Sequence, residues 1–289
     1  MTERQAIVSR ILNFSCVDGP GNRLVLFLQG CNFNCINCHN PHTINYCNDC
    51  GDCVAGCPEN ALSLDNKGKV IWDEGLCTHC DQCIDVCSYR SSPKVHHLTV
   101  SEVLSIIHGQ KWFISGITIS GGEATMQLPF IIELFERIKD DNELGHLTCF
   151  VDSNGYLSES GWNRVLPYLD GAMIDLKSWQ QETHLWLVGR SNHKVIQSIR
   201  YLAKNKKLHE IRLLHIPQKS DLDQEVDNIA CLINQLPETV IVRLNAFQHH
   251  GVEGESLQWD KCSEPQMLNF YQSLRLLIPH RIQLPSVYV

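Results

Sequence analysis

The sequence lacks three features that would place it in other classes of protein. Acidic residues outnumber basic ones by 32 to 24, and no basic run is present, so the net charge of −8 argues against a nucleic-acid partner. No stretch approaches the roughly 18 uninterrupted apolar residues that cross a membrane. The polar start also lacks the apolar segment of a secretory signal. We therefore expect a cytoplasmic protein that acts without membrane contact.

Cysteine, by contrast, is abundant. The 289-residue chain contains 15 cysteines, an odd number that does not suit a framework of disulfides. In a cytosolic chain, cysteines at this density are more often metal ligands or catalytic groups than oxidised pairs. Eleven of them lie between Cys31 and Cys87. The other four have no partner spacing, so we interpret them as ordinary buried apolar side chains: Cys16, Cys149, Cys231 and Cys262.

Outside this cysteine-rich segment, short apolar strands alternate with amphipathic helices. The predicted strands are 24–29, 116–120, 147–152, 172–176, 210–215 and 240–245. The predicted helices are 100–108, 126–139, 161–168, 194–205, 222–235 and 265–277. Such alternation predicts parallel strands joined by right-handed crossovers. The fold class is therefore α/β, a partial (β/α)6 TIM-like barrel whose chemistry lies at the carboxyl ends of the strands.

The first cysteine motif follows the first predicted strand. Cys31, Cys35 and Cys38 form a C-x₃-C-x₂-C triplet, which can hold three irons of a cubane cluster and leave the fourth iron open to a small molecule. Two alternatives fit parts of the motif. A zinc site also uses C-x₂-C pairs but needs a fourth ligand, and none is obvious nearby. The Cys35–His39 segment matches c-type haem attachment, but that reading leaves Cys31 without a role.

The second cysteine motif is an internal repeat. A C-x₂-C-x₂-C-x₃-C run recurs 30 residues later, and its members are Cys47, Cys50, Cys53, Cys57, Cys77, Cys80, Cys83 and Cys87. This is the two-cluster ferredoxin pattern, in which the fourth cysteine of each run serves the other cluster. We therefore assign Cys87 to the first three cysteines and Cys57 to the second three. Two zinc sites of four cysteines are the alternative.

Polar groups follow three successive predicted strands. Gly121, Gly122 and Glu123 come after the second strand, and paired glycines let a backbone approach a ligand closely. Asp152 begins an Asp-Ser-Asn-Gly run after the third strand, and an Asp175-Leu-Lys177 run ends the fourth. Each alone could be a turn or a surface ion pair. Together, at neighbouring strand ends, they predict one site.

These motifs together resemble the radical SAM superfamily, and more narrowly the activating enzymes of glycyl radical enzymes, such as the pyruvate formate-lyase activating enzymes. The similarity spans nearly the whole chain, from Asp18-Gly-Pro-Gly21 to the segment 187–193. It implies a radical SAM barrel that begins at 1–43 and resumes at 96–289. Residues 44–95 would be an inserted small ferredoxin-like domain, which marks the subgroup with two extra [4Fe-4S] clusters.

The resemblance also implies a role for each site residue. Cys31, Cys35 and Cys38 would bind the catalytic [4Fe-4S] cluster, whose unique iron would chelate S-adenosylmethionine. The remaining contacts to that molecule would come from Asn37, Cys38, His39, Gly121, Gly122, Glu123, Asp152, Asp175 and Lys177. The two aspartates would also hold a monovalent cation. The family's ribose-contacting histidine falls at Gln248 by an ungapped count from Gly251, and at His249 after a slip of one residue.

The activity implied is that of a glycyl radical enzyme activase. It reductively cleaves S-adenosylmethionine to a 5′-deoxyadenosyl radical, which abstracts hydrogen from a glycine of a partner glycyl radical enzyme under anaerobic conditions. Flavodoxin or ferredoxin would supply the electron, and the two insert clusters would relay it. Two other functions remain open: a radical SAM enzyme with a small-molecule substrate, and an iron–sulfur electron carrier. The second would leave Cys31, Cys35 and Cys38 without a purpose.

Overall fold

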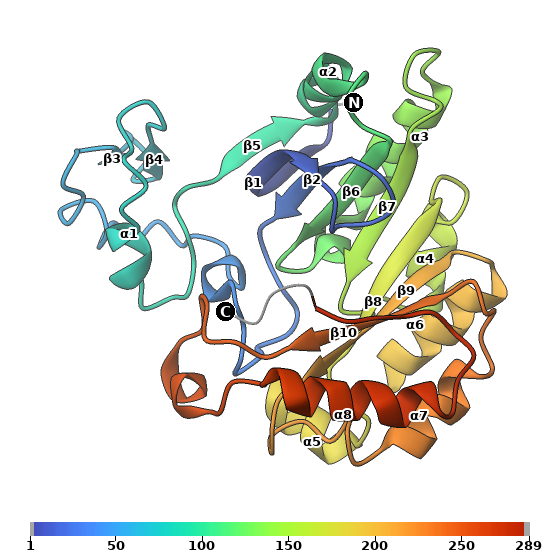
Figure 1. The fold of residues 1–289 in the computed structure, drawn as a ribbon. Coiled ribbons are helices and arrows are strands. Elements are labelled where there is room, and N and C mark those ends of the chain that lie inside the picture. Colours follow the sequence, from blue (N-terminus) through green and yellow to red (C-terminus); the bar gives the residue numbers. More distant parts are fainter. Residues whose placement is uncertain (1–2, 286–289) are drawn as a thin grey trace.

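The computed structural model describes residues 3–285, which fold around a nine-stranded sheet of order β11-β10-β9-β8-β7-β6-β2-β1-β5 (Figure 1). Its parallel strands are β2 (Arg23–Leu28), β6 (Gly116–Gly121), β7 (Thr148–Ser153), β8 (Gly171–Leu176), β9 (Leu208–His215), β10 (Ile241–Ala246) and β11 (Ile282–Gln283). Beyond β2, the sheet continues with β1 (Gln5–Ser15) and β5 (His96–Thr99), and both of these pairings are antiparallel. Because β11 and β5 end the sheet without pairing with each other, the barrel is open.

Helices connect consecutive parallel strands. They are α2 (Val100–Gln110), α3 (Leu128–Asp140), α4 (Glu159–Val165), α5 (Gln181–Val188), α6 (His193–Lys204), α7 (Val226–Ile233) and α8 (Glu264–Arg275). Their apolar faces and the strands form one core, in which Trp162, Phe135 and Phe247 are among the largest fully buried side chains. Within residues 3–285, no helix is both long enough and apolar enough to cross a membrane.

The predicted alternation of strands and helices is confirmed, with shifts at some boundaries. The helix expected over 126–139 is divided, because Pro129 favours a helix start: a 3-10 turn, η2 (Ala124–Gln127), precedes α3. The helix expected over 222–235 begins only at Val226. Among the elements of the main sheet and its helices, strands β1, β5 and β11 and helix α5 were not predicted. The sequence of β1 is neither a continuous apolar run nor a regular alternation, because Ser9, Arg10 and Asn13 interrupt its apolar residues.

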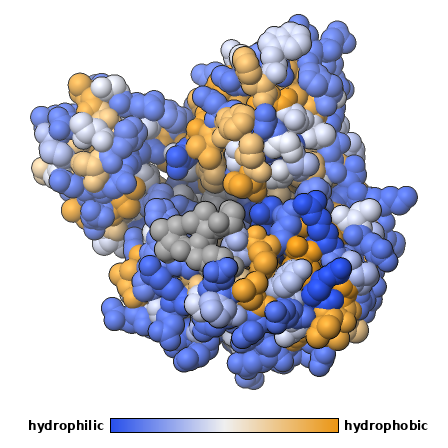
Figure 2. All heavy atoms as spheres, in the orientation of Figure 1, coloured by the Kyte–Doolittle hydropathy of each residue, from blue (hydrophilic) through white to orange (hydrophobic). Residues whose placement is uncertain are grey.

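The segment between η1 (Pro41–Thr43) and β5 forms a separate lobe with little regular structure. It contains a two-stranded sheet of β3 (Leu62–Leu64) and β4 (Val70–Trp72), and a one-turn helix, α1 (Gln82–Asp85). Figure 2 shows this lobe beside the main body of the molecule. Several of its large apolar side chains are exposed: Leu64, Ile71, Leu76, Val86 and Tyr89. Apolar burial alone therefore gives this lobe little stability.

Candidate active site

A cavity of about 280 Å³ lies at the carboxyl ends of the parallel strands. It collects nearly all of the predicted site residues: Cys31, Cys35, Asn37, Cys38, His39, Gly121, Gly122, Glu123, Asp152, Asp175 and Lys177. These residues come from the loop after β2 and from the ends of β6, β7 and β8. Residues that sequence reasoning did not assign also line it, among them Asp18, Phe33, Ser120 and Asn154.

The loop that carries the cysteine triplet is held by backbone hydrogen bonds from two sides. The amide of Cys31 donates to the carbonyl of Ile44 at 2.8 Å. The amides of Asn34 and Ile36 donate to the last two carbonyls of α5, at 3.0 and 2.9 Å. Helix α5 therefore shapes the triplet, although 150 residues separate it from this loop in the sequence. These bonds fix the backbone from which the three thiols extend.

Burial strongly disfavours ionisation of these thiols. It raises the pKa of Cys31 and of Cys35 to about 12, and it also raises the pKa of Cys38. Such thiols stay protonated at neutral pH unless a cation compensates for the lost hydration, so they are poor free nucleophiles. The lone Cys149 has a pKa raised to about 12 by burial as well. Burial is therefore not what distinguishes the triplet; its three-fold grouping is.

The glycine pair at the end of β6 leaves no room for side chains. A Cβ on Gly122 would lie 2.6 Å from the carbonyl oxygens of both Gly30 and Thr43. Gly121 has a φ of +128°, and its Cβ would meet the backbone of Leu28 at 2.2 Å. The two glycines thus allow the end of β6 to pack directly against the start of the cysteine loop. Any ligand in the cavity meets bare backbone here.

Glu123 is buried and uses its carboxylate to join two strand ends. Its oxygens accept hydrogen bonds from the amide of Asn154 at 2.7 Å and the hydroxyl of Ser153 at 2.8 Å, and also from the amide and hydroxyl of Thr125. Burial nevertheless raises its pKa. These four donors fill the usual acceptor positions of a carboxylate, so Glu123 ties β6 to β7 at the cavity wall.

The two aspartates of the cavity each have a cationic partner. Asp175 accepts from Nζ of Lys177 at 2.7 Å, and Asp152 accepts from Nη1 of Arg212 at 2.9 Å and from the hydroxyl of Ser120 at 3.0 Å. Burial raises the pKa of Asp152 to about 6, and Arg212 opposes that rise. Burial alone would lower the pKa of Lys177, but Asp175 and the neighbouring thiols raise it above its usual value.

Arg212 is a site residue that sequence reasoning missed. It lies in β9, where its Nε also donates to Glu210 at 2.7 Å, and Glu210 accepts from Nε of Arg243 at 2.9 Å. Alternation in β9 could have revealed it, because Glu210 and Arg212 share one face of the strand. Charged groups on one face of a barrel strand indicate a polar interior.

Gln248 and His249 are not among the cavity-lining residues. Nε2 of Gln248 donates to the carbonyl of Cys262 at 3.1 Å, and Nε2 of His249 lies 2.7 Å from the carbonyl of Trp259. Both side chains thus contact the backbone of residues 259–262, in the segment that follows β10. The turn itself does reach the site, because Gly251 packs so closely on the carbonyl of His39 that a Cβ would lie 2.1 Å from it.

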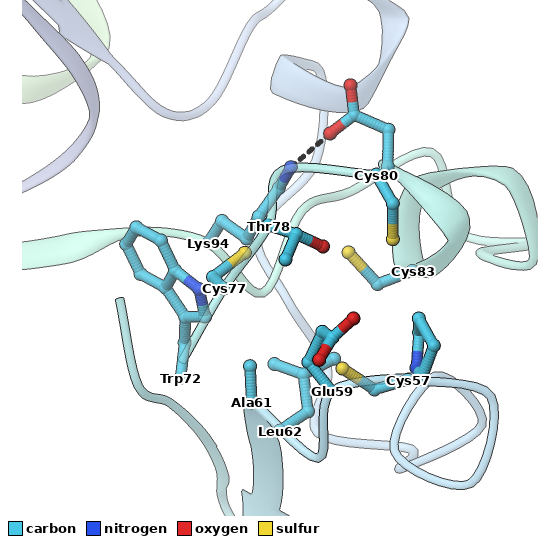
Figure 3. Close-up of a pocket in the computed structure, with 12 residues that line it drawn as sticks. Cys57, Glu59, Ala61, Leu62, Trp72, Cys77, Thr78, Cys80, Cys83 and Lys94 are labelled. Atoms are coloured by element: carbon cyan, nitrogen blue, oxygen red, sulfur yellow. Dashed lines mark hydrogen bonds and ion pairs between the residues drawn. The ribbon is translucent and has the colours of Figure 1, made fainter. Parts of the chain in front are cut away.

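The eight cysteines of the repeat gather in two groups of four. One small cavity is lined by Cys57, Cys77, Cys80 and Cys83, and Figure 3 shows these side chains around a shared space, with the Lys94–Asp81 ion pair at its edge. A second cavity is lined by Cys47, Cys50, Cys53 and Cys87. Each group takes three cysteines from one run and the fourth from the other run.

The thiol groups surround space and do not converge on a point. Within residues 3–285, no three His, Cys, Asp or Glu side chains lie close enough to hold a single metal ion. A tetrahedral zinc site requires such convergence, whereas a cubane cluster spreads its four thiolates over a larger volume. Of the four unassigned cysteines, Cys149 and Cys262 are buried as predicted. Cys16 and Cys231 are exposed, so the prediction was wrong for those two.

Comparison with known proteins places this site in a family. The sequence model of the radical SAM superfamily matches residues 25–229. The pyruvate formate-lyase 1-activating enzyme of Escherichia coli strain K12 is 30% identical over 271 residues, covering 90% of this chain and 92% of that one. The 4-hydroxyphenylacetate decarboxylase activating enzyme of Clostridioides difficile strain 630 is 28% identical over 281 residues, covering 90% and 86%.

Two solved structures show the same fold at low sequence identity. QueE from Escherichia coli has a TM-score of 0.53 at 12% identity, covering 98% of this chain and 95% of its own. SuiB from Streptococcus suis has a TM-score of 0.55 at 10% identity, covering 90% and 47%. The chain belongs to the radical SAM superfamily, and within it to the activating enzymes of glycyl radical enzymes. This family implies a [4Fe-4S] cluster and S-adenosylmethionine as cofactors.

The cavity suits these two cofactors. Three partly buried thiols, with no fourth cysteine among the residues that line the cavity, match a cluster with one open iron. Oδ1 of Asn37 is buried at the cavity and has no hydrogen-bond partner within the described structure, so an acceptor is free for a ligand donor. The expected monovalent cation stays a prediction; in this structure Asp152 and Asp175 are paired with Arg212 and Lys177.

Proposed function

We propose that this chain is a glycyl radical enzyme activase with three [4Fe-4S] clusters. The observation that carries the proposal is the single cavity that brings the three-thiol loop together with the ends of β6, β7 and β8. When bound together, the open-site cluster and S-adenosylmethionine supply a 5′-deoxyadenosyl radical that abstracts hydrogen from a glycine of the partner enzyme. The relatives named as activating enzymes support this assignment.

The residues of the chain orient and shield the reactants. Cys31, Cys35 and Cys38 would hold the cluster, and the backbone of Gly121 and Gly122, which lines the cavity, would face the methionine part of S-adenosylmethionine. Lys177, which pairs with Asp175, also offers a partly buried positive charge to a carboxylate. The apolar side chains of Phe33 and Leu214 line the cavity and would help to exclude water, which protects a radical formed there from side reactions.

We propose that residues 44–95 form a ferredoxin-like domain between barrel parts 1–43 and 96–289; residues 1–2 and 286–289 lie outside the described structure. The two four-cysteine cavities support a cluster in each. We also propose that the domain passes electrons inward from a flavodoxin or ferredoxin in the cytoplasm. Cys80→Ala should then abolish cleavage driven by that donor and spare cleavage driven by dithionite. Equal losses with both reductants would contradict a relay.

The activase proposal is tested with the reconstituted chain under anaerobic conditions. Incubated with S-adenosylmethionine and dithionite, it should release 5′-deoxyadenosine, and Cys38→Ala should abolish the release. Cys149→Ala is the matched control, because Cys149 is a buried cysteine outside the site. Mixing with candidate glycyl radical enzymes should then give a glycine-centred EPR signal. Release without any such signal would favour a small-molecule substrate, and no release from fully loaded protein would favour an electron carrier.

A further inference from the structure

Arg90 joins the cysteine-rich insert to two parts of the barrel. It lies three residues after Cys87, and its Nη1 donates to Oδ1 of Asn34 at 2.8 Å. Asn34 lies between Cys31 and Cys35 in the triplet loop. On its other side, Nε of Arg90 lies 3.9 Å from Oε2 of Glu253, in the segment after β10. Arg90 is thus one of the side chains through which the insert contacts the cluster loop.

The backbone around Arg90 is fixed for this contact. Arg90 has a φ of +48°, a left-handed conformation that costs a non-glycine residue energy unless its surroundings hold it. Its carbonyl accepts from the amide of Asn45 at 3.3 Å, and the side chain of Asn45 donates to the carbonyl of Tyr89 at 2.8 Å. The carbonyl of Asn45 in turn accepts from Nε2 of Gln29 at 2.7 Å and from Ser91 at 2.9 Å.

The guanidinium is also poorly compensated. Its Nε is buried and forms no hydrogen bond within the described structure, and its nearest carboxylate, Glu253, is at 3.9 Å with a half-exposed side chain. A cation without a close anion projects its field onto neighbouring groups more strongly than a tightly paired one. The neighbours of Arg90 are the triplet loop and, across three residues of chain, the ligand Cys87.

We propose that Arg90 is a positioning residue that fastens the insert to the loop carrying Cys31 and Cys35, and whose charge makes the cluster held there easier to reduce. This role rests on the proposed function, because it presupposes a cluster on that loop. The hydrogen bond to Asn34 sets the shape of the loop from the insert side, opposite the bonds from α5. A positive charge beside a cluster favours its reduced, more negative state.

The test uses the EPR component that changes when S-adenosylmethionine is added. A redox titration of this component gives its midpoint potential, and a titration with S-adenosylmethionine gives the dissociation constant of that molecule. In Arg90→Gln the midpoint should become more negative, and binding should weaken on the order of tenfold, the effect of losing one charge-assisted hydrogen bond. Arg90→Lys should keep the midpoint but not the affinity. Asn34→Ala should also weaken binding while it keeps the midpoint, because the charge remains.

Arg4→Gln is the matched control, because Arg4 pairs with Glu133 at 3.3 Å on the surface and its side chain is 57% exposed. It should match the wild type in both measurements. An Arg90→Gln protein with full iron content, wild-type midpoint and wild-type affinity would overturn the inference. If the wild-type chain shows no component that responds to S-adenosylmethionine, the proposed function fails instead, so the two failures are distinguishable.

Discussion

Asp152 keeps its charge against the effect of burial, and this makes the site sensitive to pH. Burial raises its pKa to about 6, and Arg212 opposes the rise from 2.9 Å. We expect binding of S-adenosylmethionine to weaken as pH falls through about 6, because protonation breaks this ion pair. In Arg212→Gln, the opposing charge is gone, so the transition should move to higher pH. A binding titration on both sides of pH 6 measures the shift.

The effect of Asp152 on the free energy of unfolding has the opposite pH dependence to its effect on binding of S-adenosylmethionine. Because its pKa is higher in the folded chain than in the unfolded one, its contribution to the free energy of unfolding decreases as pH rises from its ordinary pKa to about 6.

In the binding titration, Lys139→Gln is the control for Arg212→Gln, because it also removes a cation from an aspartate, Asp170, at 2.6 Å. Equal pH midpoints in the two variants would contradict a role for Arg212.

Alanine substitutions at two glycines, Gly122 and Gly109, distinguish a steric effect at the site from the general effect of adding a methyl group. Gly122→Ala should abolish binding of S-adenosylmethionine, because its Cβ would lie 2.6 Å from two carbonyl oxygens and push the cysteine loop away. Gly109 occupies an exposed position in α2, where an added Cβ meets no atom within 4 Å, so Gly109→Ala should stabilise the chain by about 1 kcal/mol. Measurements of thermal unfolding and of S-adenosylmethionine binding in both variants test these two expectations. Retained binding in Gly122→Ala would refute the close packing.

At the scale of the element, the crossed grouping of the repeat cysteines can be tested by pairs of substitutions. Cys47 and Cys87 line one cavity, so Cys47→Ala with Cys87→Ala should remove one cluster, about four irons. Cys47 and Cys57 line different cavities, so substituting both should remove two clusters, about eight irons. Iron analysis of the reconstituted variants measures this. The reverse result would show that each run binds its own cluster.

Much of the architecture could be predicted from sequence because local patterns specify it. All six central strands are found. Four of them, β2, β6, β7 and β8, are nearly continuous buried runs, which have a strong signal. The other two, β9 and β10, alternate buried and partly exposed residues, which is also typical of a strand. Cysteine spacing likewise anticipated which thiols share a cavity. Spacing succeeds here because three of the four cysteines in each group lie within a few residues of one another.

What could not be predicted depends on contacts between distant segments. β1 is recognisable only once β2 and β5 pair with it, and α5 only once its carbonyls meet the cysteine loop. Arg212 and Asp152 lie 60 residues apart, and their contact follows from the order of strands in the barrel. The choice between Gln248 and His249 as the ribose contact stays a prediction for the same reason. Both side chains turn toward the segment 259–262, whose position the local sequence does not encode.

At the scale of the whole molecule, the insert and the barrel should differ in their dependence on metal. The barrel has a continuous apolar core, whereas the lobe of residues 44–95 leaves many of its large apolar side chains exposed. We expect iron removal to unfold the lobe and leave the barrel folded, because ligand bonds supply most of its stability. Limited proteolysis should then cut between residues 46 and 90 first. Uniform cleavage along the iron-free chain would contradict this expectation.

The anchoring of the triplet loop by α5 has a consequence for how the protein matures. The amides of Asn34 and Ile36 find their acceptors at Val188 and Leu187, so the loop is not fully anchored until more than half of the chain has been synthesised and folded. The repeat cysteines need only the 41 residues from Cys47 to Cys87. Iron should therefore enter the insert early, and the reactive centre should be completed last, inside a barrel that already shields it.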